Sequence, residues 1–160
     1  MIILTFMGTI KQKIFNHLQC LLSPNQPFKS PLDVAAGKVI EEWIDYNGHM
    51  NMAYYVQCFE ETSDYLLEHI NLGYDYAVKE NKGIFVIKCE INYRKEISLH
   101  ESFTISVQSV LIQGKKMIVE LVMRNNSDQV TAEYKILNLN VDLKSKKSVP
   151  FDATVINNLN

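Results

Sequence analysis

The stretch DYNGHMN, residues 45–51, decides how this chain folds. Its Asn47-Gly48 pair is a strong turn signal, because both residue types tolerate a positive φ. Asn51 then provides a good helix N-cap, and the 19 residues that follow it contain no Gly or Pro. Bulky side chains recur there at helical spacing, at Tyr55, Phe59, Thr62, Leu66 and Ile70. The stretch therefore predicts a sharp turn that leads into one long helix over residues 52–70.

Strands are expected on both sides of this helix. Residues 37–44 read as a first strand that ends at Asp45. After a loop at 79–83 the pattern changes to alternation, which puts Phe85, Ile87, Cys89, Ile91 and Tyr93 on one face of a strand. Three more strands are predicted over residues 103–111, 117–124 and 130–141, separated by turn residues. The four later strands should form an antiparallel meander, so the fold class is α+β, with a curved antiparallel sheet around one long central helix.

The length of 160 residues fits one domain. We expect residues 1–36 to form an N-terminal arm and a proline-rich linker, residues 37–151 the domain itself, and residues 152–160 a C-terminal tail. Three prolines between residues 24 and 31 motivate the linker. Residues 10–22 fit a short amphipathic helix, although an extended arm is an equal alternative.

Composition excludes several classes of function. The net charge of −2 and the lack of any segment that mixes basic and aromatic residues argue against nucleic-acid binding. Cys20, Cys58 and Cys89 are odd in number and widely spaced, which favours neither disulfides nor a metal site and fits a reducing cytoplasm. Residues 1–7 are apolar, but Lys11 and Lys13 interrupt the run, so we expect no signal peptide and no membrane span.

A carboxylate, an amide and an imidazole alternate on the turn, at Asp45, Asn47 and His49. The helix start beside them offers unpaired N–H groups, near Met52 and Ala53, that suit the oxyanion of an attacked thioester. Asp45 would then act as nucleophile or as the base that activates water, with Asn47 and His49 as orienting groups. A purely structural alternative has Asp45 capping the turn, Asn47 present for a left-handed backbone and His49 half-buried.

Residues 45–55 resemble the acyl-CoA thioesterases of the 4-hydroxybenzoyl-CoA thioesterase superfamily, in which an aspartate precedes the central helix. The Asp-x-Asn-x-His alternation is similar to that of plant acyl-ACP thioesterases. The longer string over residues 42–56 most closely resembles the betainyl-CoA thioesterases of carnitine degradation. The resemblance implies a hotdog fold, hydrolysis of an acyl-CoA, and assembly as a homodimer or homotetramer. It implies no separate cofactor, because coenzyme A is part of the substrate. The sequence departs from the family pattern at residues 99–101, where a Gly-Asp pair is common.

The substrate that this resemblance implies carries a quaternary ammonium group, which proteins hold with aromatic faces and nearby negative charge. Trp43, Tyr46 and Tyr54 are candidates to line such a pocket together with Asn51, whereas Tyr55 and Phe59 lie on the apolar stripe of the helix and are expected in the core.

Charged candidates complete the predicted site. Glu60 is a candidate acid on the helix, while its neighbours Glu61, Asp64 and Glu68 are expected to face solvent. Arg94 and Lys95 are candidates to bind the phosphates of CoA.

Two other functions fit the same residues. A hotdog dehydratase would act on hydroxyacyl thioesters with a different arrangement of His and acid. A non-catalytic acyl-CoA-binding module would bind the thioester and release no CoA.

Overall fold

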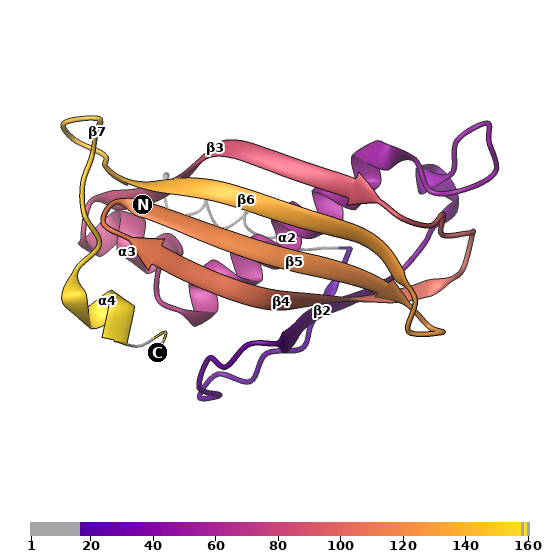
Figure 1. Ribbon diagram of the computed structural model, residues 1–160, viewed down its shortest axis with the longest axis horizontal. Coiled ribbons are helices and arrows are strands. Elements are labelled where there is room, and N and C mark those ends of the chain that lie inside the picture. Colours follow the sequence, from indigo (N-terminus) through magenta and orange to yellow (C-terminus); the bar gives the residue numbers. More distant parts are fainter. Residues whose placement is uncertain (1–16, 158, 160) are drawn as a thin grey trace, which may run out of the picture.

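The computed structural model describes residues 17–157 and 159. In chain order its elements are β1 (Gln19–Cys20), β2 (Leu32–Lys38), the 3₁₀ turn η1 (Glu41–Trp43), α2 (Met52–His69), α3 (Tyr74–Lys79), β3 (Lys82–Tyr93), β4 (Ser102–Gln113), β5 (Lys116–Asn125), β6 (Val130–Asp142), β7 (Lys147–Ser148) and α4 (Ala153–Asn157). The strands form one antiparallel sheet in the order β1-β2-β4-β5-β6-β3, with β7 beside β6. This sheet curls over α2, as predicted (Figure 1).

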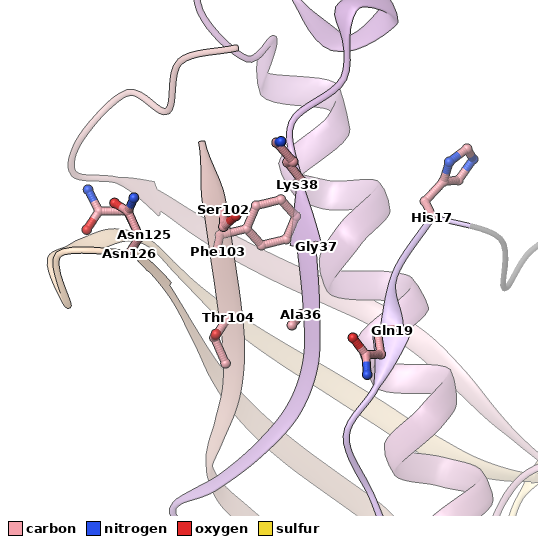
Figure 2. A pocket seen from close by; sticks show the side chains of 10 residues that line it. All are labelled: His17, Gln19, Ala36, Gly37, Lys38, Ser102, Phe103, Thr104, Asn125 and Asn126. Atoms are coloured by element: carbon pink, nitrogen blue, oxygen red, sulfur yellow. The ribbon is translucent and has the colours of Figure 1, made fainter. Parts of the chain in front are cut away.

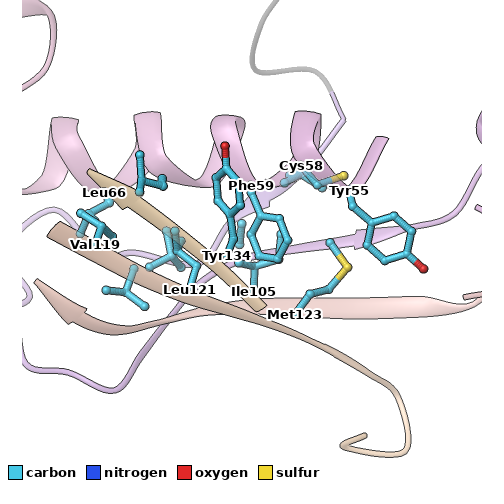
Figure 3. Close-up of a cluster of buried hydrophobic side chains, with 14 of the residues drawn as sticks. Tyr55, Cys58, Phe59, Leu66, Ile105, Val119, Leu121, Met123 and Tyr134 are labelled. Atoms are coloured by element: carbon cyan, nitrogen blue, oxygen red, sulfur yellow. The ribbon is translucent and has the colours of Figure 1, made fainter. Parts of the chain in front are cut away.

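Helix α2 is the centre of the core. It buries Tyr55, Phe59 and Leu66 against the inner face of the sheet, where strand alternation turns apolar side chains of β4 to β6 inward (Figure 3). The Phe59 ring stacks on the Tyr134 ring with centroids 4.9 Å apart. Because both rings are buried, the contact fixes the helix over β6. The predicted helix and the core roles of Tyr55 and Phe59 are confirmed.

The first strand was predicted in the wrong place. It runs over Leu32–Lys38 and pairs with β4, whereas residues 41–43 form the 3₁₀ turn η1. The reason is tertiary, because Trp43 is buried and its ring contacts the rings of Tyr54 and Phe103. An extended chain over residues 37–44 would not bring Trp43 to that position.

The four later strands do not form one meander. Strands β4, β5 and β6 follow one another in space, but β3 pairs with β6 and lies at the far edge of the sheet. The connection over residues 94–101 therefore passes from one edge strand to β4, beside β2. Sequence patterns specify strands and turns but carry little information on such non-local pairing.

A β-bulge interrupts the alternation predicted for β3. The register shifts between Val86 and Lys88, so Phe85 pairs with Leu139 and Val86 with Asn138. The extra residue turns Phe85 to the opposite face from Cys89, Ile91 and Tyr93. The predicted single face therefore holds only for the second half of the strand.

The arm before β2 is attached to the domain. The described part of the predicted 10–22 helix contains the strand β1, and residues 1–16 lie outside the described residues. The Leu18 N–H donates to Glu61 Oε1 at 3.0 Å, and Leu18 packs so near Gly37 that an added Cβ there would lie 2.6 Å from its side chain. Part of the sheet thus precedes residue 37, while the division of the chain at residues 36 and 151 stays a prediction.

None of the helices in the described ranges combines the length and apolar character needed to cross a membrane. The longest, α2, spans 18 residues and carries several carboxylates.

Candidate active site

The predicted turn at residues 45–51 forms a short closed loop between η1 and α2. Ile44 and Met50 make an antiparallel bridge, and the Gly48 N–H donates to the Asp45 carbonyl at 3.0 Å. Gly48 has φ +83°, a conformation that L side chains rarely adopt, whereas Asn47 does not have a positive φ. The left-handed backbone proposed as a structural reason for Asn47 is therefore wrong, and glycine alone supplies it.

The Asp45 carboxylate is held from two sides. Its Oδ1 accepts the backbone N–H of Asn47 at 2.8 Å, and its Oδ2 accepts the side-chain N–H of Asn51 at 3.4 Å. The Asn51 Oδ1 in turn accepts the N–H of Ala53 at 2.9 Å, which caps α2. The carboxylate thus has a fixed position directly beside the start of the long helix.

His49 lies half-buried on the same loop. Its Nδ1 is 3.4 Å from the carbonyl oxygen of Met50. Because a carbonyl oxygen can only accept, this contact favours Nδ1 as the protonated nitrogen of the neutral ring and leaves Nε2 as an acceptor.

A hollow of about 560 Å³ opens at this loop. It gathers predicted site residues from the turn and the helix start, and residues from the end of β3. Its lining consists of Asp45, Tyr46, Asn47, His49, Met50, Asn51, Met52, Tyr55, Tyr93, Arg94, Lys95 and Glu96. We call it the Asp45 hollow.

Sequence patterns missed Tyr93 and Glu96 as members of this site. The Tyr93 hydroxyl donates to the carbonyl of Met52 at 3.2 Å, and the Tyr93 ring stands at 86° to the ring of Tyr55, with centroids 5.3 Å apart. Tyr93 was predicted only as a strand residue, because nothing local places the end of β3 at the start of α2.

Some predicted site residues lie elsewhere. Trp43 and Tyr54 stack on each other with centroids 5.6 Å apart, and neither lines the Asp45 hollow. The N–H of Ala53 is taken by the Asn51 cap. Tyr46 does line the hollow and is 98% exposed.

The acids of α2 do not behave as one solvated face. Glu60 accepts a hydrogen bond from the Tyr134 hydroxyl at 2.9 Å and does not line the Asp45 hollow. Glu61 is 2% exposed, so the prediction that it faces solvent is wrong, and its Oε1 binds Leu18. Glu68 accepts the N–H of Tyr74 at 2.9 Å. Burial, with Glu60, Glu68 and Glu61 nearby, raises the pKa of Asp64 from 3.8 to about 6.

The predicted phosphate-binding cations lie at the rim of the hollow. Arg94 donates twice to Glu133 Oε2, at 2.9 and 2.6 Å, and the Lys95 ammonium donates to Gln129 Oε1. Both pairs are exposed, so these bonds contribute little to stability and an anion can compete for the cations.

A second hollow of about 530 Å³ lies on β2 and β4 (Figure 2). Lys38, Ser102, Thr104 and the Asn125-Asn126 turn surround it, and no carboxylate lines it. We call it the outer hollow. Over the described ranges, no group of His, Cys, Asp and Glu side chains is arranged to hold a metal ion.

Comparison with known sequences decides the family. Residues 39–159 match the model of the thioesterase-like superfamily. This chain belongs to the thioesterase-like superfamily. It is accordingly an enzyme of the thioester-hydrolase class, as its sequence predicts.

Three curated relatives fit this assignment. The betainyl-CoA thioesterase of Pseudomonas aeruginosa is 28% identical over 74% of this chain and 75% of its own length. The L-carnitine dehydrogenase/betainyl-CoA thioesterase of Rhizobium meliloti is 32% identical over 79% of this chain, which spans only 25% of that relative. The long-chain acyl-CoA thioesterase FadM of Escherichia coli is 28% identical over 69% of this chain and 83% of its own.

Solved structures confirm the hotdog fold. A Staphylococcus aureus protein in complex with CoA superposes with a TM-score of 0.76 at 18% identity, covering 84% of this chain and 85% of the other. A Pseudomonas putida protein superposes with a TM-score of 0.69 at 27% identity, covering 82% and 84%.

Proposed function

We propose that this thioesterase hydrolyses a small acyl-CoA to the free acid and CoA, and that Asp45 carries the reaction. The observation that supports this is the position of its carboxylate, fixed by Asn47 and Asn51 at the start of α2 and open to a hollow large enough for the acyl end of the substrate. No separate cofactor is required, because CoA is part of the substrate.

In this mechanism the thioester carbonyl lies against the start of α2, where the N–H groups of Ala53 and Tyr54 already bind Asn51 and the N–H of Met52 is the first-turn donor left for the substrate. This N–H and the positive end of the helix dipole stabilise the oxyanion. Asp45 either takes a proton from the water that attacks the carbonyl carbon, so that the thiolate of CoA leaves and the free acid forms directly, or attacks the carbon itself, so that the thiolate leaves and water then hydrolyses the resulting anhydride to the free acid and Asp45. His49 Nε2 and Asn47 lie on the same loop and orient the carboxylate, water or substrate.

We propose betainyl as the first acyl group to test. Support comes from the betainyl-CoA thioesterases that match 74% and 79% of this chain. FadM, at similar identity, makes a long acyl chain the alternative. Such a reaction would place the enzyme in carnitine metabolism, and free cysteines fit a cytoplasmic location.

We also propose that the chain forms a homodimer through β3. This strand is 12 residues long and, on the side away from β6, pairs with no other strand of the described chain. Val86 and Ile87 on it are 49% and 52% exposed. A long apolar edge strand of this kind is usually covered, and two copies can cover each other by pairing. Ile87→Lys should convert a dimer to a monomer in light scattering, and a wild-type monomer would contradict the proposal.

The test of the activity is thiol release over a panel of acyl-CoAs, with wild-type protein and Asp45→Asn. This variant keeps the acceptor for the Asn47 N–H and removes the charge. We expect release of CoA by the wild type and loss of nearly all of it in the variant. Full activity in Asp45→Asn would contradict the role of Asp45.

The same panel separates the alternatives. A dehydratase would yield an enoyl-CoA without free thiol, and a binding module would bind the acyl-CoA without releasing CoA. Neither alternative predicts an effect of Asp45→Asn on thiol release.

A further inference from the structure

The charged side chains that line the Asp45 hollow differ in whether they have hydrogen-bond partners. Arg94 and Lys95 are bound to Glu133 and Gln129, which are residues of β6 and of the turn before it and do not line the hollow. Glu96, by contrast, makes no hydrogen bond or ion pair with any residue in the described part of the chain. Because Gln129 is neutral, Lys95 keeps its positive charge, but with Arg94 paired to Glu133 the carboxylates of Asp45 and Glu96 still outnumber that one cation.

An aromatic side chain lines the same hollow as that carboxylate. Tyr93 is fixed at both ends, by its hydroxyl on the Met52 carbonyl and by its ring on Tyr55, yet it is 41% exposed where it lines the hollow. Glu96 also lies near Tyr55, because its charge contributes to raising the pKa of that phenol to about 12, after burial as the main cause. Tyr93, Tyr55 and Glu96 thus line one hollow.

A fixed aromatic ring and an unpaired carboxylate that line one hollow suit the binding of a quaternary ammonium group. The ring attracts the cation through its quadrupole, and the alkyl groups of the cation pack on it without needing hydrogen bonds. A neutral acyl group of the same shape gains the packing but neither of the two electrostatic contributions.

We propose that Tyr93 and Glu96 select an acyl group that carries a permanent positive charge. This rests on the proposed function, since the selected group is the acyl part of the thioester that Asp45 cleaves. Asp45 itself adds a second negative charge on the same hollow. Neither Tyr93 nor Glu96 takes part in bond breaking, so both set specificity.

Two thioesters of equal shape test this. Betainyl-CoA carries a trimethylammonium group, and 3,3-dimethylbutanoyl-CoA has a carbon atom in place of the nitrogen. The selectivity ratio is kcat/KM for the first divided by kcat/KM for the second. Because the positive charge also activates the thioester carbonyl, the ratio is compared between variants rather than with unity.

We expect Tyr93→Leu to lower the ratio by about 3- to 10-fold, and Glu96→Gln to lower it by about 2- to 5-fold and to weaken its dependence on salt. Tyr93→Phe keeps the ring and should hold the ratio to within about 2-fold. Glu80→Gln, an exposed carboxylate outside the hollow, should change neither rate. An unchanged ratio in both Tyr93→Leu and Glu96→Gln would overturn the proposal.

Calorimetry on Asp45→Asn separates this proposal from the activity. The variant should bind betainyl-CoA at least about 3-fold more tightly than the neutral thioester, whether or not wild-type protein turns either over. Equal affinities would overturn the charge selection and leave hydrolysis untouched. Absence of thiol release with selective binding would overturn the hydrolysis alone.

Discussion

The two hollows of this protein have nearly the same volume, about 560 Å³ at Asp45 and about 530 Å³ on β2 and β4. They differ in how their polar groups are held. At Asp45 a carboxylate is fixed by a backbone N–H and an amide, next to a helix start. The outer hollow is lined by uncharged side chains, one lysine and the imidazole of His17, and by no carboxylate. Size alone therefore does not distinguish the two hollows, whereas the fixed position of a charged group does.

The largest expected effect comes from removing the charge at Asp45. Asp45→Asn should lower kcat/KM for the preferred acyl-CoA by about 10²- to 10⁴-fold, because a positioned base or nucleophile contributes that much. Steady-state thiol release measures the rate, and thermal unfolding checks that the variant is folded. If kcat/KM of Asp45→Asn falls by less than about 10-fold, the Asp45 hollow has no catalytic role that separates it from the outer hollow.

The next effect tests the amide that links Asp45 to the helix. Asn51→Asp keeps a good N-cap for α2 but replaces the donor to Asp45 Oδ2 with a second carboxylate. Two carboxylates at one site retain a proton to higher pH than one does, so the acid limb of kcat/KM against pH should move up by about one pH unit. On the acid limb the rate should then be about 10-fold below that of the wild type at the same pH, as one pH unit implies, and well above the limb, at neutral pH, it should change little.

Asn51→Ser is the matched control for that variant. It keeps the cap and loses the donor without adding charge, so its acid limb should move less. If Asn51→Asp lowers stability and leaves the pH profile in place, Asn51 acts as a cap only.

A carboxyl group outside both hollows should affect stability rather than catalysis. The pKa of Asp64 is raised to about 6, so the folded protein holds this proton more tightly than the unfolded chain. The stability it contributes is present below pH 3.8 and is lost as pH rises through about 6. Asp64→Asn should remove that loss.

A pKa shift of two units corresponds to about 2.7 kcal/mol of free energy. Because Asp64 is partly exposed to solvent, we expect Asp64→Asn to raise the free energy of unfolding at pH 7 by only about 1 kcal/mol. Urea unfolding between pH 4 and pH 8 measures this gain. Asp75→Asn, an exposed partner of Lys79 on α3, should not change the pH dependence of stability in this way. A loss of activity in Asp64→Asn with unchanged stability would place Asp64 in the site.

The smallest expected effect is in the outer hollow. Lys38→Met removes the cation that lines it and should leave kcat/KM within about 2-fold, as for an ordinary surface substitution. A loss comparable to that of Asp45→Asn would show that the outer hollow takes part in the reaction.

Local signals were enough to predict the loop that carries the candidate catalytic residues. Turn chemistry at Gly48, the cap at Asn51 and the helical spacing after it act over a few residues, so Asp45, Asn47 and His49 could be placed on one loop beside a helix start. The same kind of local signal predicted the curved sheet and its central helix, because apolar residues recur every two residues in the strands and every 3.6 residues in the helix.

What the tertiary structure decided is which distant segments meet. Trp43 looked like a pocket residue beside Asp45, but packing against Tyr54 and Phe103 turns it into the core. Tyr93 was predicted only as a strand residue and Glu96 was not singled out, whereas in the structure β3 pairs with β6 and the end of β3 lies at the start of α2. Neither outcome follows from local preferences, because Trp43 meets Phe103 and Tyr93 meets Met52 across long stretches of chain that only the complete sheet brings together.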